Sequence, residues 1–184
     1  MKDYIDVDVI GSYVPYMRMG PASRALLQFA NHDAHLYGIN SAWRARVTDG
    51  GTFTGKLDIT RGKRNDGGSL YQLMPAVLSL GWAQQWQAFT GTVDVIGVAS
   101  KTAVDTRRGE SKTAGYALVN LGGQFQVNRA LSLQAGVRNL FDRAYDLPLG
   151  GANLAAFKAN AAATQMGAVP GQGRSIDVGM KLKF

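Results

Sequence analysis

The chain has 184 residues, no cysteine and a formal net charge of +7. This length suffices for one domain with a core, and the absence of cysteine excludes disulfides, zinc–thiolate sites and thiol catalysis. The basic residues are scattered, and the only adjacent pairs are Lys63-Arg64 and Arg107-Arg108. Without a basic helix or a basic–aromatic stripe, the composition disfavours nucleic-acid binding.

No stretch of about 18 apolar residues is present, so the sequence predicts no transmembrane helix. The first residues, Met1 to Asp6, turn acidic at once and lack the apolar core of a secretory signal. If the protein is exported, we expect its leader to be missing from this sequence.

Alternation of apolar and polar residues predicts eight β-strands. The first covers residues 5–9, where Ile5, Val7 and Val9 alternate with Asp6 and Asp8. The others fall at residues 37–47, 53–59, 78–82, 89–95, 119–127, 131–137 and 174–184. One short Ala-rich helix is predicted inside a loop, around Leu154 to Ala163. The pattern indicates an all-β protein.

The last segment, residues 174–184, reads RSIDVGMKLKF and alternates strictly until the chain ends on Phe184. A terminal strand that ends on an aromatic residue is typical of bacterial outer-membrane barrels.

The predicted connections alternate between short and long. The short ones are residues 48–51, 84–87 and 128–130, and the long ones are residues 11–30, 62–75, 100–114 and 147–173. Transmembrane β-barrels have this asymmetry, with short periplasmic turns and long extracellular loops. With a periplasmic C-terminus and eight strands, the N-terminus is predicted to be periplasmic as well.

The alternation also assigns the two faces of the sheet. The apolar positions are expected to meet lipid, which offers polar groups no hydrogen bonds. Trp43, Trp82, Phe89, Phe125 and Phe184 are predicted to form an aromatic girdle near the short turns. The polar positions are expected to line a wet lumen: Asp6, Asp8, Arg44, Arg46, Lys56, Asp58, Asp94, Gln124, Gln126, Gln134, Arg138, Asp177 and Lys181.

Residues 136–151, GVRNLFDRAYDLPLGG, closely resemble the C-terminal signature of TonB-dependent outer-membrane receptors. The matching positions are Asn139, Leu140, Phe141, Asp142, Arg143 and Tyr145, with Phe184 as the terminal aromatic residue. Residues 114–121 are similar to the family's preceding strand, and residues 4–10 and 29–38 to strands further upstream. The resemblance covers essentially the whole chain.

The resemblance implies a 22-stranded barrel with an N-terminal plug that contacts TonB. Residues 1–184 would be the C-terminal part of that antiparallel transmembrane β-barrel, without the plug and the upstream strands. It further implies an integral protein of the Gram-negative outer membrane, a receptor and transporter for a ferric siderophore, copper or another scarce nutrient. We expect this segment alone not to transport.

The resemblance also implies partners. They are outer-membrane lipid, the barrel-assembly machinery through the C-terminal strand, and TonB only through the missing plug. No cofactor and no nucleic-acid partner are expected. Two histidines without cysteine give no catalytic constellation, so we expect no enzyme. Gly171 and Gly173 lack the strand–turn–helix setting of a dinucleotide site.

Ligand contact is expected in the long loops, with Tyr13, Tyr16, Arg18, Tyr71 and Arg107 as candidates. Residues 113–121 and 146–153 are similar to the copper-associated branch of the family, and copper takes Met or His ligands. The available candidates are Met17, Met19, His32, His35 and Met166. Met17 and Met19 suit a strand face equally well, and two histidines three apart point to opposite faces of a strand. We therefore predict no metal site in this chain.

Two other interpretations remain open at this point. One is an autonomous eight-stranded outer-membrane barrel with a structural or surface-binding role, whose interior would be filled by side chains. The other is a soluble barrel that binds a small ligand, which requires an apolar interior and a polar exterior.

Overall fold

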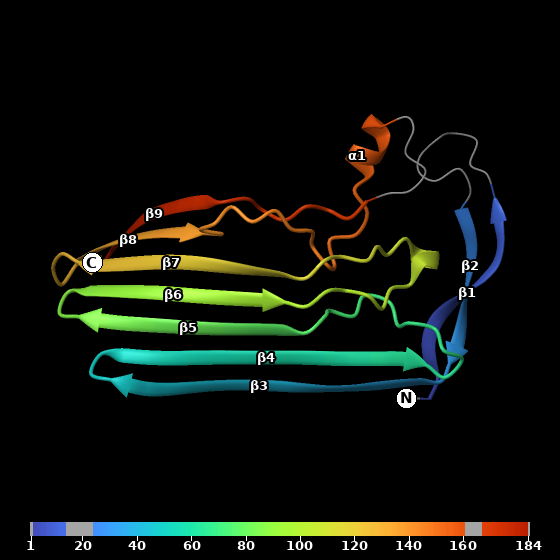
Figure 1. Cartoon of the computed structure of the whole chain (residues 1–184), viewed down its shortest axis with the longest axis horizontal. Helices are drawn as coiled ribbons and strands as arrows, with labels where there is room; N and C mark the ends of the chain where they lie inside the picture. The colour runs from blue at the N-terminus through green and yellow to red at the C-terminus, as the bar shows by residue number, and fades with distance from the viewer. Residues whose placement is uncertain (1, 14–23, 161–166, 184) are drawn as a thin grey trace.

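The computed structural model describes residues 2–13, 24–160 and 167–183, which form two antiparallel sheets (Figure 1). The first sheet contains β1 (Tyr4–Tyr13) and β2 (Arg24–His32). The second contains, in chain order, β3 (Ala34–Thr48), β4 (Gly51–Arg64), β5 (Val77–Trp86), β6 (Phe89–Val98), β7 (Tyr116–Gln126), β8 (Leu131–Arg138) and β9 (Ser175–Leu182). Each strand of the second sheet pairs with its sequence neighbour, which confirms the antiparallel all-β prediction.

Apolar residues lie opposite one another across all seven strands of the large sheet. One continuous row consists of Ala45, Phe53, Trp82, Val93, Leu121, Val137 and Ile176. Cross-strand apolar pairs of this kind fix the register, because a slip by one residue would move every side chain to the other face.

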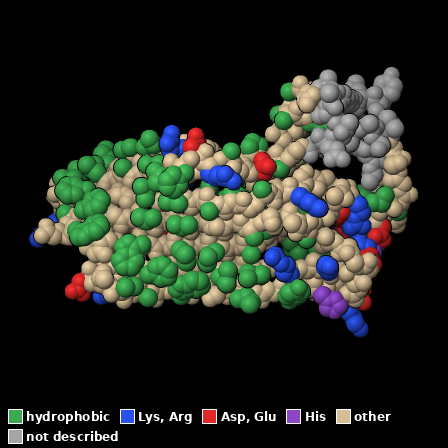
Figure 2. Space-filling view, in the orientation of Figure 1, with side chains coloured by type: hydrophobic (Ala, Val, Ile, Leu, Met, Phe, Trp, Pro, Cys, Tyr) green, Lys and Arg blue, Asp and Glu red, His purple; other side chains and the backbone are tan. Residues whose placement is uncertain are grey.

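The two faces of the large sheet differ as the alternation predicts. Side chains on the apolar face are exposed, for example Val178 at 84% and Met180 at 74%. Figure 2 shows hydrophobic side chains gathered over the part of the sheet nearer the short turns. The opposite face, with Thr92, Asp94 and Asn120, lines a hollow of about 780 Å³. So large an apolar surface is unfavourable in water and favourable against lipid. It is the inverse of what a soluble ligand-binding barrel needs.

The short connections lie together at one end of the sheet (Figure 1). Gly50 takes a φ of 76° in the turn between β3 and β4, and Gln87 takes a φ of 48° between β5 and β6. Asn128 caps the turn between β7 and β8, because its Oδ1 accepts from the backbone N–H groups of Ala130 and Leu131, both at 2.8 Å. The long connections over residues 65–76, 99–115, 139–160 and 167–174 lie at the other end, so the predicted asymmetry is confirmed for the large sheet. The predicted long connection over residues 11–30 is wrong, because it contains the end of β1 and most of β2.

The predicted first strand does not belong to the large sheet. β1 pairs only with β2, from Tyr4 opposite His32 to Tyr13 opposite Arg24. This hairpin lies at the long-loop end (Figure 1), and Asp33 alone separates β2 from β3. The large sheet therefore has seven strands, not eight, and is entered from the long-loop end. The prediction of a periplasmic N-terminus is wrong, because alternation reveals a strand but not its partner.

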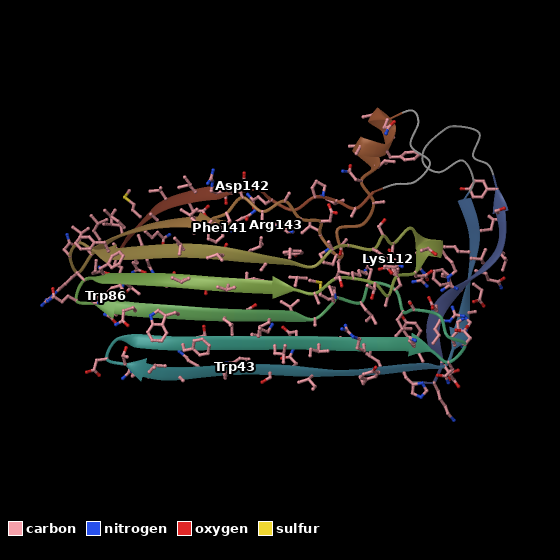
Figure 3. The ribbon with its side chains drawn as sticks, viewed as in Figure 1. Trp43, Trp86, Lys112, Phe141, Asp142 and Arg143 are labelled. Carbon is pink, nitrogen blue, oxygen red and sulfur yellow. The ribbon has the colours of Figure 1, made fainter. Side chains whose placement is uncertain are left out.

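The aromatic girdle also differs in part from the prediction. Phe89 and Phe125 are direct partners near the short turns, and Trp86 stacks on Phe89 with ring centroids 5.9 Å apart. The prediction missed Trp86 because it was assigned to a turn. Figure 3 shows Trp86 beside the short turns and Trp43 further along β3. Phe184 lies outside the described residues.

Helical structure is limited to two short elements in the part of the chain that the structure describes. These are η1 (Thr106–Arg108) and α1 (Leu154–Ala159). The side chain of Asn153 caps α1, because its Oδ1 accepts from the backbone N–H of Ala156 at 2.9 Å. Over residues 2–13, 24–160 and 167–183, no helix has the length and apolar character needed to cross a bilayer.

Candidate functional site at the long-loop end

Asn139 organises the signature segment that follows β8. Its side chain is buried at 4% exposure, and its backbone takes a left-handed φ of 49°. Its Oδ1 accepts from the backbone N–H of Arg143 at 2.8 Å, and its Nδ2 donates to the carbonyls of Arg143 (3.0 Å) and Gln172 (3.2 Å). One amide thus closes the turn and binds it to the segment that leads into β9.

The remaining signature residues extend the same structure. The Tyr145 ring packs against Tyr116 with centroids 4.3 Å apart, and its carbonyl accepts from the N–H of Gly171 at 2.7 Å. Asp142 accepts from the N–H of Arg174 at 2.8 Å. Phe141 is 74% exposed. Figure 3 shows Phe141, Asp142 and Arg143 in sequence on the connection after β8. The signature is therefore a structural turn that joins β7, β8 and the approach to β9.

A second feature is a cluster of charged residues at the long-loop end. We define the loop-end ionic cluster as Asp6, Asp8, Arg64, Asp66, Asp105, Arg107 and Arg108. At its centre the carboxylate of Asp6 is fully buried and pairs with Arg64 at 3.1 Å and with Arg108. The carbonyl of Val7 accepts from Arg64 at 3.2 Å and from Arg107 at 3.1 Å. Because burying an unpaired carboxylate is costly, these cations are needed for β1 to pack here.

The cluster continues from Arg64 toward β2. The guanidinium of Arg64 pairs with Asp8 at 3.1 Å, and the Nε of Arg64 donates to Asp66 at 3.0 Å. His32 lies between these carboxylates, with its Nε2 3.1 Å from Asp8. The hairpin β1–β2 is thereby tied to residues 65–76 and 99–115. The prediction that Asp6 and Asp8 line the lumen is wrong, since both lie in this cluster and not on the polar face of the large sheet.

Two pKa values in the cluster are displaced by these contacts. The hydrogen bond from Arg64, followed by one from the backbone of Gly68, holds the pKa of Asp66 below its ordinary value. The hydrogen bond to Asp105 raises the pKa of Arg107, against the opposing effect of burial. Asp66 and Arg107 therefore keep their charges at neutral pH.

A buried pair beside the cluster ties the long loops together. Lys101 pairs with Glu110 at 2.7 Å and donates to the carbonyl of Pro148 at 3.1 Å. Glu110 also accepts from the backbone N–H groups of Gln72 (2.9 Å) and Asp105 (2.7 Å). Residues 65–76, 99–115 and 139–174 are therefore joined through one buried ion pair. No sequence signal marks these two residues, because their partners come from different loops.

The structure brings together two of the five predicted ligand-contact residues. The guanidinium of Arg108 lies 4.7 Å above the Tyr71 ring, and its neighbour Arg107 lies in the same cluster. Tyr13 sits at the far end of β1, opposite Arg24. Tyr16 and Arg18 fall outside the described residues.

The candidate copper ligands are only partly described. Met17, Met19 and Met166 fall outside the described residues, and His32 lies beside the ionic cluster, where its Nε2 is 3.1 Å from Asp8. In the described ranges, no group of three or more His, Cys, Asp or Glu residues is arranged to hold a metal ion.

A family model described as "TonB dependent receptor-like, beta-barrel" matches residues 1–140. The chain belongs to the TonB-dependent receptor family. This confirms the resemblance inferred from the signature segment. Receptors of this family sit in the outer membrane and work with TonB, and the family consists of receptors and transporters rather than enzymes.

Three solved structures have the same fold. The "Copper transporter OprC" matches with a TM-score of 0.80 and 23% identity, covering 100% of this chain and 27% of that one. A mutant of the ferric enterobactin receptor PfeA from Pseudomonas aeruginosa matches with a TM-score of 0.69 and 20% identity, covering 100% and 27%. The ferric yersiniabactin uptake receptor FyuA from Yersinia pestis matches with a TM-score of 0.64 and 17% identity, covering 85% and 25%.

This chain therefore spans about a quarter of the length of these structures. At these identities the likeness shows the fold alone. No match was found among curated protein sequences.

Proposed function

We propose that this chain is the C-terminal barrel segment of an outer-membrane receptor that takes up a scarce nutrient. The observation that carries the proposal is the open seven-stranded sheet, with its apolar outer face and its long loops joined by ion pairs, in a chain that aligns along its entire length with 27% of the copper transporter chain. Open sheet edges are not viable in lipid, because their backbone groups would have no hydrogen-bond partners. Uptake therefore requires further strands to close the wall, and a plug to couple it to TonB.

The unpaired edges of the large sheet also disfavour an autonomous eight-stranded barrel. In the described residues β3 pairs only with β4, and β9 pairs only with β8. A self-sufficient eight-stranded barrel would instead pair its first and last strands with each other.

For the nutrient we propose a ferric siderophore or copper, with first contact at the long-loop end through Tyr13, Tyr16, Arg18, Tyr71 and Arg107. The names of the neighbours support both substrate classes, and the aromatic and cationic character of these five residues suits an anionic iron chelate. Copper would need Met or His ligands.

The test is an uptake assay in the bacterium that carries this gene. Deleting the coding sequence should abolish accumulation of one labelled nutrient, tested with ferric catecholate, ferric hydroxamate and copper in parallel. Restoring the gene with all of its natural upstream sequence should restore uptake, whereas residues 1–184 alone should not. Unchanged uptake of every nutrient tested would overturn the proposal.

A further inference from the structure

A second cavity lies on the outer face of the sheet at the long-loop end, away from the ionic cluster. It has a volume of about 370 Å³ and forms where β4 runs past its partner, since β5 begins at Val77 opposite Asp58. Its walls are the outer ends of β3 and β4 on one side and residues 73–75 and 100–103 on the other. Leu73, Met74 and Pro75 give that second wall an apolar lining.

The strand wall of this cavity continues the apolar face of the sheet. Ile39 lies opposite Ile59 in the apolar face, and the next two positions on that face pair Tyr37 with Arg61 and His35 with Lys63. Toward the long-loop end, an apolar pair is thus followed by a pair of Tyr37 and Arg61 and then by a pair of His35 and Lys63. Figure 2 shows hydrophobic side chains gathered toward the short-turn end and more Lys and Arg toward the long-loop end. In a membrane barrel this transition marks the boundary between hydrocarbon and headgroups.

Two cations of this cavity, Arg61 and Lys63, have no carboxylate partner within the described part of the chain. The cavity lining contains His35, Arg61, Lys63 and Lys101 and no Asp or Glu. Lys101 is already paired with Glu110. No carboxylate among residues 2–13, 24–160 and 167–183 lies within ion-pair distance of Arg61 or Lys63, and Arg61 donates only to the carbonyl of Thr60 at 3.3 Å. Two cations with an apolar wall beneath them complement an amphiphile with an anionic head.

We propose that this cavity binds the phosphate headgroup of an anionic lipid in the outward-facing leaflet. Arg61 and Lys63 bind the phosphate oxygens, Tyr37 sits at the headgroup level, and Met74 and Pro75 contact the first part of an acyl chain. Arginine and lysine are the side chains that bind phosphate through charge-assisted hydrogen bonds. The inference rests on the proposed placement of the chain in the outer membrane.

The test uses protein purified in detergent from outer membranes, at the length that the cell makes. Native mass spectrometry measures retention of added phosphatidic acid against phosphatidylcholine. The double variant Arg61→Gln/Lys63→Gln should weaken phosphatidic acid binding about tenfold or more, because each cation near the surface contributes to anionic lipid binding. Arg61→Lys/Lys63→Arg should retain it. The matched control Arg44→Gln/Arg46→Gln removes the same charge from the opposite face of β3 and should leave binding unchanged.

Three outcomes would overturn the proposal. One is equal loss in both Gln variants, which would indicate a general charge effect. Another is unchanged binding in Arg61→Gln/Lys63→Gln. The third is displacement of the lipid by inorganic phosphate at equal concentration, which would indicate a site for free phosphate. Failure of the proposed function is seen separately, because the protein would then be missing from the outer-membrane extract.

Discussion

The side chain of Asn139 makes three hydrogen bonds from a left-handed backbone position. Asparagine is one of the few residues that tolerate such a φ, and its amide supplies both an acceptor and donors. We expect Asn139→Ala to lower the free energy of unfolding by about 2–3 kcal/mol, from about 1 kcal/mol for each lost bond. Asn139→Asp keeps the acceptor but places a buried carboxylate oxygen opposite the carbonyls of Arg143 and Gln172, so it should destabilise the fold at least as much as Ala. Guanidinium unfolding in micelles measures this, and equal midpoints for all three would contradict it.

Asp6 holds two cations at the centre of the ionic cluster. Asp6→Asn would leave Arg64 and Arg108 without their shared buried carboxylate, a change that costs about 3–5 kcal/mol in buried pairs. We expect the β1–β2 hairpin to detach, which hydrogen exchange would register as lost protection over residues 4–13 and 24–32. The control is Asp58→Asn, which breaks the more exposed pair of Lys56 and Asp58 at 3.0 Å. Equal protection in the Asp6 and Asp58 variants would contradict the assignment.

Acid should weaken the attachment of the loops through Asp66. Its pKa in the folded chain lies below the ordinary value of 3.8, so the folded state binds this proton more weakly than the unfolded state does. The contribution of Asp66 to stability is therefore complete above about pH 5 and is lost as pH falls below 3.8 toward the folded value. Protection of the hairpin, followed between pH 7 and pH 3, should fall in the wild type. In Asp66→Asn this part of the pH dependence should disappear, and identical curves would contradict the prediction.

For most of these residues, the sequence predicts where along the chain they lie but not which partners they contact. The sequence singled out the pairs Lys63-Arg64 and Arg107-Arg108 as cations in loops, and three of the four supply the ionic cluster. Their partner Asp6 lies 58 residues from Arg64 and 102 from Arg108. Nothing local in a sequence encodes a contact over such separations. The signature segment was recognisable, but its bonds to Gln172 and Arg174 were not.

Among the elements, the hairpin β1–β2 shows most clearly what alternation leaves open. Residues 5–9 have the pattern of a half-buried strand, and they do form one. The pattern is equally satisfied by a partner in the large sheet and by a partner in a separate hairpin. The strand that decides between them, β2, reads RALLQFANH and does not alternate. By contrast, the turns after β3 and β7 could be placed because Gly50 and Asn128 carry a local signal. The turn after β5 has neither residue, and its predicted bounds therefore took in Trp86.

The connection between β8 and β9 depends on a close approach at Gly171. A Cβ at this position would penetrate the Tyr145 ring, whereas at Gly167 it would meet no atom within 4 Å. We expect Gly171→Ala to destabilise the fold by about 1–3 kcal/mol through overpacking, and Gly167→Ala to be neutral. Thermal unfolding in micelles compares the two variants. The double variant Gly171→Ala/Tyr145→Ala should show a smaller loss than the sum of its single changes, and full additivity would contradict the contact.

For the whole molecule, the open sheet predicts how the isolated chain behaves. β3 and β9 each present an unpaired edge in the described residues, and exposed edges promote aggregation. Refolded alone into micelles, residues 1–184 should give β-type circular dichroism or aggregates, but no band whose electrophoretic mobility changes on boiling. The protein with its natural upstream sequence should give such a band. A heat-modifiable band from the isolated chain would mean that these strands close by themselves.

The number of strands in the large sheet has a further consequence. Closed single-chain barrels of bacterial outer membranes contain an even number of strands, and seven is odd. In the proposed receptor barrel, an odd number of additional strands would therefore complete the wall, and the last of them would run from the short-turn side to the long-loop side before the chain reaches β3. In such a barrel, the β1–β2 hairpin would form the outer end of the loop that joins the last upstream strand to β3. The ion pair between Asp6 and Arg64 would hold this hairpin against the neighbouring loops.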